Sequence, residues 1–170
     1  LADDILRHEG NRGFTAAINT GLRHLRLGYD SVVLLNNDTA PQKGWLEEMV
    51  KTAQTDEEIG IVSARIMEWE GHGIRAIGGS DWLGGVAMQG ASRQDLLDAI
   101  QAHPFVPFTA VLLTRQLVET IGLLDERFVN NCSDNDYCQR ATMAHFKIVS
   151  DPTAIVRHRE SETVLSIKEY

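Results

Sequence analysis

Cysteine is scarce in this sequence: of its 170 residues, only Cys132 and Cys138 are cysteines. Two cysteines this close together, around a predicted helix start, suit neither a disulfide framework nor a zinc site, so we expect reduced thiols. No apolar run approaches the roughly 18 residues that a membrane-spanning helix needs, and no signal peptide is visible. These absences predict a cytoplasmic protein, with peripheral association at the inner membrane face as a second expectation.

Basic residues are in the minority. Lys and Arg number 16 against 24 Asp and Glu, which leaves a formal net charge of −8. Nucleic-acid binding relies on a basic face that neutralises phosphates, so we expect no nucleic-acid partner. An acidic protein can still bind a phosphorylated ligand through a metal ion, because the cation supplies positive charge locally. With 43% hydrophobic residues, the chain can bury a substantial core, and we expect residues 1–170 to form a single domain.

Helix and strand patterns alternate along the chain, which predicts an α/β fold. Three- and four-residue apolar spacing and helix-start signals predict helices over residues 14–28, 45–53, 114–121 and 134–144. Short apolar runs predict strands over residues 32–35, 59–64, 105–113, 146–149 and 154–156, the first two as buried parallel strands. Seven glycines interrupt residues 67–101, so this segment is expected to be a loop-rich insertion with short hairpin strands.

Three polar side chains, Asn36, Asn37 and Asp38, directly follow the strand predicted at residues 32–35. Open α/β sheets bind their ligands at the carboxyl ends of strands. Oxygen ligands at such a place suit Mg²⁺ or Mn²⁺ bridging phosphates. The same residues are also favourable in a turn, and the segment alone does not decide between the two interpretations.

A second polar group begins with Asp125 and Glu126 and continues to Asp134 and Asp136. Four acids in twelve positions make a candidate general-base region. Ser133 followed by Asp136 also resembles a capping box, and acids in a first turn favour the helix dipole. These acids could therefore serve the chemistry or only start a helix.

Two further features near predicted strand ends could bind a ligand. His158, after the strand at residues 154–156, is a candidate metal or phosphate ligand, although a lone histidine is more often a surface side chain. Trp69 and Trp82, in the glycine-rich region, could stack on a sugar or belong to the core.

Five segments together point to a known family. In chain order they are Asn11-Arg12-Gly13-Phe14 with Ala17, Asn19 and Gly21; Leu35-Asn36-Asn37-Asp38-Thr39 with Gly44-Trp45-Leu46; residues 121–128 (IGLLDERF); residues 133–140 (SDNDYCQR); and residues 151–158 (DPTAIVRH). In this order and at these separations they resemble the motifs of a family 2 glycosyltransferase, an inverting enzyme with the GT-A fold, most closely its rhamnosyltransferase-like members. The resemblance covers nearly the whole chain.

The resemblance implies a GT-A-like, mostly parallel sheet flanked by helices. It also implies a role for each matching residue. Asp38, with Asn36 at the first place of its motif, would hold Mn²⁺ or Mg²⁺ on the diphosphate of a nucleotide-sugar donor, and His158 would contact the metal or the diphosphate. Asn11 and Gly13 would contribute to donor binding. Asp134 would be the general base that activates a glycan, lipid-linked or protein acceptor.

The chain also departs from the family pattern. Members normally begin with two strands that read the nucleotide base, and these are not in the sequence, so we expect an N-terminally truncated fold with an unpaired sheet edge. The sequence is then a fragment, or a second copy or partner chain covers the edge, or donor binding is lost. Ser133, Ile18 and Thr109 replace the family's usual glutamate, arginine and glycine. His145 stands where glycine is usual, and histidine tolerates positive φ better than most residues.

Two other functions remain open. One is a catalytically inactive GT-A-like module with a glycan-binding or assembly role. The other is a nucleotidyltransferase on a related sheet, but that function needs a glycine-rich, basic phosphate loop near the start, and none is visible.

Overall fold

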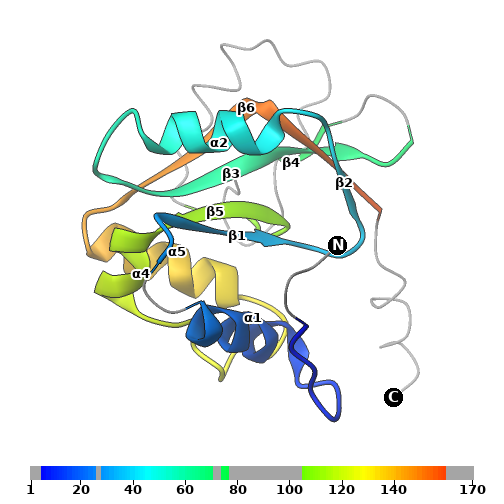
Figure 1. Ribbon diagram of the computed structural model, residues 1–170, viewed down its shortest axis with the longest axis vertical. Helices are drawn as coiled ribbons and strands as arrows, with labels where there is room; N and C mark the ends of the chain where they lie inside the picture. The colour runs from blue at the N-terminus through cyan, green and yellow to red at the C-terminus, as the bar shows by residue number, and fades with distance from the viewer. Residues whose placement is uncertain (1–4, 26–27, 71–73, 77–104, 160–170) are drawn as a thin grey trace.

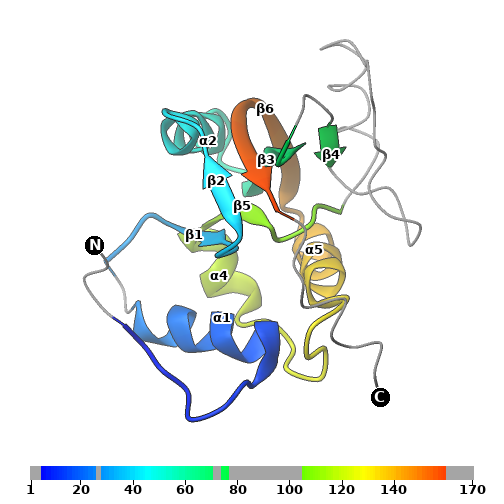
Figure 2. The same ribbon diagram turned by 90° about the vertical axis from the view of Figure 1, so that its right-hand side faces the viewer.

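The computed structural model describes residues 5–25, 28–70, 74–76 and 105–159. Its elements build one six-stranded sheet with helices on both faces, which confirms the predicted α/β class (Figure 1). One face is covered by α2 (Trp45–Ala53). The opposite face carries three helices, as the turned view in Figure 2 also shows: α1 (Gly13–His24), α4 (Arg115–Ile121) and α5 (Ser133–Met143).

The sheet has the strand order β1-β5-β3-β6-β2, with β4 paired to β3 beside this path. The strands are β1 (Ser31–Leu35), β2 (Thr39–Pro41), β3 (Ile59–Glu68), β4 (Ile74–Ala76), β5 (Ala110–Thr114) and β6 (Lys147–His158). Only β3 and β6 pair in parallel, and the other neighbouring pairs are antiparallel. The expectation of a mostly parallel sheet is corrected here: β5 runs antiparallel between β1 and β3, so the sheet is mixed.

Two apolar clusters hold the layers together, one on each face of the sheet. The cluster against α2 is built from Met49, Ile59, Val62, Ala64, Ile66, Ala110, Leu112, Ala154 and Val156. The cluster against α1, α4 and α5 is built from Ile61, Val106, Phe108, Val111, Leu113, Leu117, Leu124, Tyr137, Cys138 and Ala141. Successive residues of β5, and of β3 from Ile61 onward, enter opposite clusters, as the two-residue period of a strand requires. Both strands are buried on both faces, which explains their nearly continuous apolar sequences.

Strand β1 differs from this expectation. It pairs with β5 on one side, and its other edge has no strand partner among the described residues. Ser31 to Leu34 are half-buried and Leu35 is exposed. The sequence predicted a buried parallel strand here. The structure instead shows a half-buried strand at the edge of the described sheet.

Two strand boundaries were also predicted wrongly. Strand β5 begins at Ala110, five residues later than expected from Phe105, because Phe108 and Thr109 form a turn. The two strands expected at residues 146–149 and 154–156 are one strand, β6, interrupted by a bulge after Asp151. The Asp151 carboxylate closes this bulge by accepting hydrogen bonds from the backbone N–H and hydroxyl of Thr153 (2.8 and 2.6 Å).

The four predicted helices are confirmed, although α1 ends at His24, before Gly28. His145 has φ 66°, the left-handed conformation that glycine most often supplies at a helix end. Strand β4 is a short strand of the expected insertion, whereas residues 77–101, with Trp82, lie outside the described residues. No helix in the described ranges is long and apolar enough to cross a membrane.

Candidate active site

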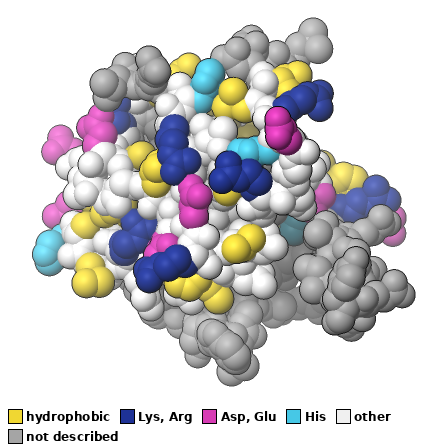
Figure 3. Space-filling view, turned by 90° about the horizontal axis from the view of Figure 1, so that it is seen from below, with side chains coloured by type: hydrophobic (Ala, Val, Ile, Leu, Met, Phe, Trp, Pro, Cys, Tyr) yellow, Lys and Arg dark blue, Asp and Glu magenta, His cyan; other side chains and the backbone are white. Residues whose placement is uncertain are grey.

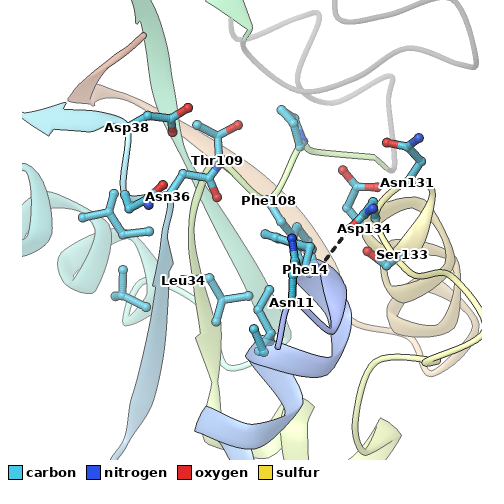
Figure 4. A pocket seen from close by; sticks show the side chains of 17 residues that line it. Asn11, Phe14, Leu34, Asn36, Asp38, Phe108, Thr109, Asn131, Ser133 and Asp134 are labelled. Carbon is cyan, nitrogen blue, oxygen red and sulfur yellow. Dashed lines mark hydrogen bonds between the residues drawn. The ribbon is translucent and has the colours of Figure 1, made fainter. Parts of the chain in front are cut away.

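A cavity of about 970 Å³ opens where β1 and α5 approach the turn before β5 (Figure 4). Of the candidate residues predicted from sequence, five line it: Asn11, Asn36, Asn37, Asp38 and Asp134. Figure 4 shows Asp38 and Asp134 on opposite sides of the opening, with Phe108 and Thr109 between them. The described residues that line the cavity include these two carboxylates and no lysine or arginine. A phosphorylated ligand would therefore need a cation brought from outside the lining.

Asp38 and His158 are brought together although they lie 120 positions apart. Asp38 follows β1, and the pairing of β2 with the end of β6 places Thr39 opposite His158. His158 Nε2 consequently lies 3.1 Å from Asp38 Oδ1, with both side chains about one-fifth exposed. Asn37 and Asp38 form a turn, so the turn and the ligand interpretations of this segment are compatible.

Asp38 and His158 are within hydrogen-bond distance of each other, and the same separation would suit two ligands of one divalent cation. Ligands at adjacent octahedral positions are about 3 Å apart when each lies about 2.1 Å from the metal, close to the observed separation of Oδ1 and Nε2. No group of three or more His, Cys, Asp or Glu side chains suited to a metal occurs within the described part of the chain. A site with few protein ligands is typical of Mg²⁺-like ions that share their coordination with substrate phosphates.

Asp134 is in the first turn of α5, where its half-buried carboxylate lines the cavity. Burial raises the pKa of Asp134, because the charged form loses hydration, and the hydrogen bond donated by the Asn135 backbone N–H (2.9 Å) opposes this shift. A carboxyl group with a raised pKa is a better proton acceptor once it is ionised. The geometry therefore allows Asp134 to serve as a base.

The expected capping box at Ser133 was wrong. The residue before α5, Cys132, has φ 65°, and no side chain caps the helix. The Asp136 backbone N–H donates to the Cys132 carbonyl (3.0 Å), while the Asp136 carboxylate accepts from Arg140 Nε (2.9 Å). Asp136 thus pairs within the helix and does not reach back to Ser133.

Gly13 and its neighbours fasten α1 to the segment that precedes α5. The Gly13 backbone N–H donates to Asn11 Oδ1 (2.9 Å), the Phe14 N–H to Asn130 Oδ1 (3.1 Å) and the Thr15 N–H to the Val129 carbonyl (3.2 Å). Gly13 has φ 83° and lies against Val129 and Asn130. The first N–H groups of α1 are therefore bonded to protein oxygens, and the helix start holds the 129–130 segment beside the cavity.

Asn19, in the same family segment, has a structural role. Its buried side chain donates to the Leu124 carbonyl (2.8 Å) and accepts from the Leu124 backbone N–H (2.9 Å), and it also donates to Glu126 Oε1 (3.0 Å). Two of the segments that carried the family resemblance, at residues 11–21 and 121–128, therefore contact each other directly.

Arg140 connects α5 to residues 121–123 by hydrogen bonds. Its guanidinium donates to Asp136 and to the carbonyls of Ile121 (2.9 Å) and Leu123 (3.1 Å), and its Cζ atom lies 4.8 Å from the Tyr137 ring centroid. Arginine suits this position because its planar guanidinium can donate hydrogen bonds to several oxygen acceptors at the same time.

We expect Arg140→Met to lower the free energy of unfolding by about 2 kcal/mol, because hydrogen bonds to a charged donor are lost. The matched control is Arg127→Met, since the Arg127 side chain is 87% exposed and pairs only locally with Asp125 among the described residues. Its effect should be much smaller, because an exposed ion pair contributes little to stability. Denaturant unfolding measures the free energy of unfolding of both variants. Equal losses would contradict the stabilising role of Arg140.

Several cavity residues were not identified from the sequence: Phe14, Pro107, Phe108, Asn130 and Asn131. The Asn130-Asn131 pair just before the acidic segment was the available signal. The sequence offered no such signal for Phe108, because an apolar residue next to an apolar run is normally interpreted as part of the hydrophobic core. Its ring also packs edge-on against Tyr137, with 5.8 Å between the centroids.

Both cysteines are free, as predicted. Burial raises the pKa of the Cys138 thiol to about 12, so this side chain stays protonated and unreactive. On the face of the molecule that carries α1, Figure 3 shows acidic and basic side chains interspersed, without one large patch of a single sign.

The sequence model of the family described as "Glycosyltransferase like family 2" matches residues 5–169. The chain belongs to glycosyltransferase family 2. The pre-mycofactocin glycosyltransferases of two Mycobacterium tuberculosis strains, CDC 1551 / Oshkosh and ATCC 25618 / H37Rv, are each 26% identical to it over 155 residues. That match covers 91% of this chain and 32% of each relative, so the chain spans about a third of their length.

Solved glycosyltransferases share the fold of this family 2 chain. One is the mannosyltransferase PcManGT from Pyrobaculum calidifontis in complex with GDP-Man and Mn²⁺, with a TM-score of 0.62 and 17% identity over 90% of this chain and 38% of that chain. Another is GalNAc-T7 with UDP, GalNAc and Mn²⁺, with a TM-score of 0.66 and 16% identity over 90% of this chain and 31% of that chain. These similarities confirm the GT-A fold.

Proposed function

We propose that this chain forms the catalytic part of a metal-dependent, inverting glycosyltransferase that moves a sugar from a nucleotide-diphosphate donor to a glycan, lipid-linked or protein acceptor. The observation that carries the proposal is the placement of Asp38 and Asp134 on opposite sides of one cavity, with His158 paired to Asp38. A departing diphosphate needs positive charge, and an attacking hydroxyl needs a base. The two sides of the cavity meet these two requirements.

Asp38 and His158 would hold Mn²⁺ or Mg²⁺, and Asn36 would add an amide at the same cavity wall. When bound, the cation offsets the negative charge of the diphosphate, which the lining cannot do. The Mn²⁺ ions present with both structural neighbours support this assignment. Asn11 lines the same cavity, so a donor contact from its side chain is also part of the proposal, with Gly13 holding Asn11 in place.

Asp134 would accept the proton of the acceptor hydroxyl as that oxygen attacks the anomeric carbon from the face opposite the leaving group. Attack from that side inverts the anomeric configuration. The new bond joins the acceptor oxygen to the sugar, the sugar–phosphate bond breaks, and the electron pair leaves with the diphosphate. Phe108 and Thr109 lie between the donor side and the base, where they would contact the transferred sugar.

We also propose that the free edge of β1 is covered in the active protein, by further strands, a second copy or a partner chain. Val33, Leu34 and Leu35 line the cavity from this edge strand, so whatever pairs with β1 would complete the nucleotide side of the pocket.

The first test is a thermal-shift assay with a panel of nucleotide-sugars that includes GDP-mannose and UDP-GalNAc, each with and without Mn²⁺ or Mg²⁺. We expect one donor with metal to raise the Tm by about 3–6 °C at saturating concentration. Asp38→Ala should remove the shift because the cation loses its carboxylate. Asp30→Ala, which removes an exposed acid at the other end of β1, should keep it.

A shift that survives in Asp38→Ala would contradict the metal assignment. If no nucleotide-sugar shifts the Tm with either metal, donor binding by this chain is ruled out. Stabilisation by glycans without nucleotide or metal would favour the inactive glycan-binding module instead.

A further inference from the structure

Arg65, in the middle of β3, has no hydrogen-bond or ion-pair partner within the part of the chain that the structure describes. Its Nε atom is buried and makes no hydrogen bond, and among the described residues no acid forms an ion pair with it. The other orphaned buried side-chain atom in the described ranges is Ser150 Oγ. Buried polar groups are nearly always satisfied in native proteins, so an exception calls for an explanation.

The two orphaned groups share one face of the sheet. Residues alternate along β3: Val62, Ala64 and Ile66 enter the cluster against α2, whereas Ile61 enters the cluster against α1, α4 and α5. Arg65 therefore shares the face of Ile61, on which α5 carries Asp134. Ser150 pairs with Ser63, which lies two residues, or about 7 Å, before Arg65 on the same face.

The sheet register also places Arg65 beside the cavity. Strand β3 pairs with β5 up to Ser63 and Val111, and continuing this register by two residues brings Arg65 level with Thr109. Thr109 lines the cavity, and its carbonyl accepts a hydrogen bond from the Asn36 backbone N–H (2.9 Å). Arg65 thus lies toward the same end of the sheet as Thr109 and Asn36, although it is not itself among the residues that line the cavity.

The charge balance makes this position unusual. The described cavity lining holds two carboxylates and no cation, and Arg65 is the unpaired cation of the adjacent strand. Arg157, next to β3 in the sheet, donates instead to the Glu68 carbonyl (2.8 Å). A guanidinium held without a protein partner is ready to bind a carboxylate or a phosphate with two parallel hydrogen bonds.

We propose that Arg65 binds an anionic group, a carboxylate or a phosphate, on the acceptor substrate. This inference rests on the proposed function, because only that function assigns an acceptor substrate to the chain. The position of Arg65 on the sheet favours the acceptor over the donor. Arg65 lies on the face of the sheet that carries Asp134, the residue that would act on the acceptor. Asp38 and His158, which would bind the donor diphosphate through a metal, meet beyond the end of β1. The acceptor therefore carries a carboxylate or a phosphate group.

The first arm of the test compares stabilities without ligand. Arg65→Met keeps the length of the aliphatic stem and removes the unpaired guanidinium, so we expect its Tm to rise by about 3 °C. Arg115→Met removes the same charge from an exposed site on α4 and should change the Tm by less than about 1 °C. A lower Tm for Arg65→Met would show a structural role and overturn the proposal.

The second arm uses glucuronate and glucose 6-phosphate as probes, with glucose as the neutral match and NaCl to equalise ionic strength. We expect either anionic sugar to raise the wild-type Tm by about 3 °C more than glucose does at several times its dissociation constant. Arg65→Met should lose this difference, Arg65→Lys should keep part of it, and Arg115→Met should keep all of it. An unchanged difference in Arg65→Met would refute the anion site.

The third arm separates acceptor from donor. The nucleotide-sugar and Mn²⁺ shift should be the same in Arg65→Met as in the wild type, while Asp38→Ala loses it. If Arg65→Met loses it as well, the arginine serves the donor diphosphate and the acceptor assignment is wrong. If the wild type shows no nucleotide-sugar shift but does show an anion shift that depends on Arg65, the anion site stands and the proposed glycosyl transfer falls.

Discussion

Asp134→Asn is expected to reduce the rate of sugar transfer by about 10²–10⁴-fold, because asparagine cannot accept the proton of the attacking hydroxyl. Asparagine keeps the size of the side chain and an oxygen that can still accept from the Asn135 backbone N–H. The loss should therefore appear in kcat, with little change in donor affinity. Steady-state kinetics together with the donor thermal shift measures both quantities.

The same substitution should change the pH dependence of stability. Burial raises the pKa of Asp134, so between its unfolded and folded pKa values the native state binds more protons than the unfolded state. Stability is then lost as the pH rises from the unfolded pKa of about 3.9 through the raised folded value. Asp134→Asn has no such loss, so its Tm advantage over the wild type should be small in acid, grow across this window and then level off.

The acidic limb of the wild-type pH–rate profile should lie above the ordinary pKa of aspartate, because the base acts only when it is ionised. Asp136→Asn is the matched control within α5: it weakens the pair with Arg140 but should leave the position of that limb unchanged. Transfer by Asp134→Asn within about tenfold of the wild-type rate would remove Asp134 from the role of base.

Gly13→Ala should lower the free energy of unfolding by about 3 kcal/mol or more. A β-carbon there would clash with Val129 Cγ1 and approach the Val129 carbonyl oxygen to 2.8 Å and Asn130 Oδ1 to 2.9 Å. The backbone of Gly13, at φ 83°, also strains any residue with a side chain. Because three backbone N–H groups at the start of α1 lie in this region, moving the segment to relieve the clash would break hydrogen bonds.

Gly21→Ala is the control in the same helix. A β-carbon at Gly21 meets nothing within 4 Å, and alanine is the better helix former, so we expect a gain of about 0.5–1 kcal/mol. Urea unfolding of the two variants measures the contrast. Similar free energies for Gly13→Ala and Gly21→Ala would show that the start of α1 is not held against Val129 and Asn130.

Much of the fold could be predicted from local patterns. Three- and four-residue apolar spacing and helix-start signals located the four helices of the described residues, because a helix on a sheet must bury one stripe of its own residues. Apolar runs located the buried parts of β3 and β6. Boundaries failed where a tertiary contact overrides the local pattern, as at the Asp151 bulge and the turn before β5.

The order of polar segments also indicated the candidate site. Asn36 and Asp38 after one strand, Asp134 at a helix start and His158 near the end of the described chain suggested one centre, because strand ends meet at one edge of a sheet. Asn36, Asp38 and Asp134 line one cavity and His158 pairs with Asp38, although the chemistry assigned to these residues stays a prediction.

By itself, then, the sequence determined the α/β class, the helices and the identity of the polar residues that gather at the strand ends, since each of these depends on side chains close together in the chain. Only the tertiary structure decided that β5 lies antiparallel between β1 and β3, that His158 meets Asp38, and that Arg65 has no partner among the described residues. Pairing between distant strands sets these features, because it depends on which edges and faces meet, and local sequence patterns do not record that.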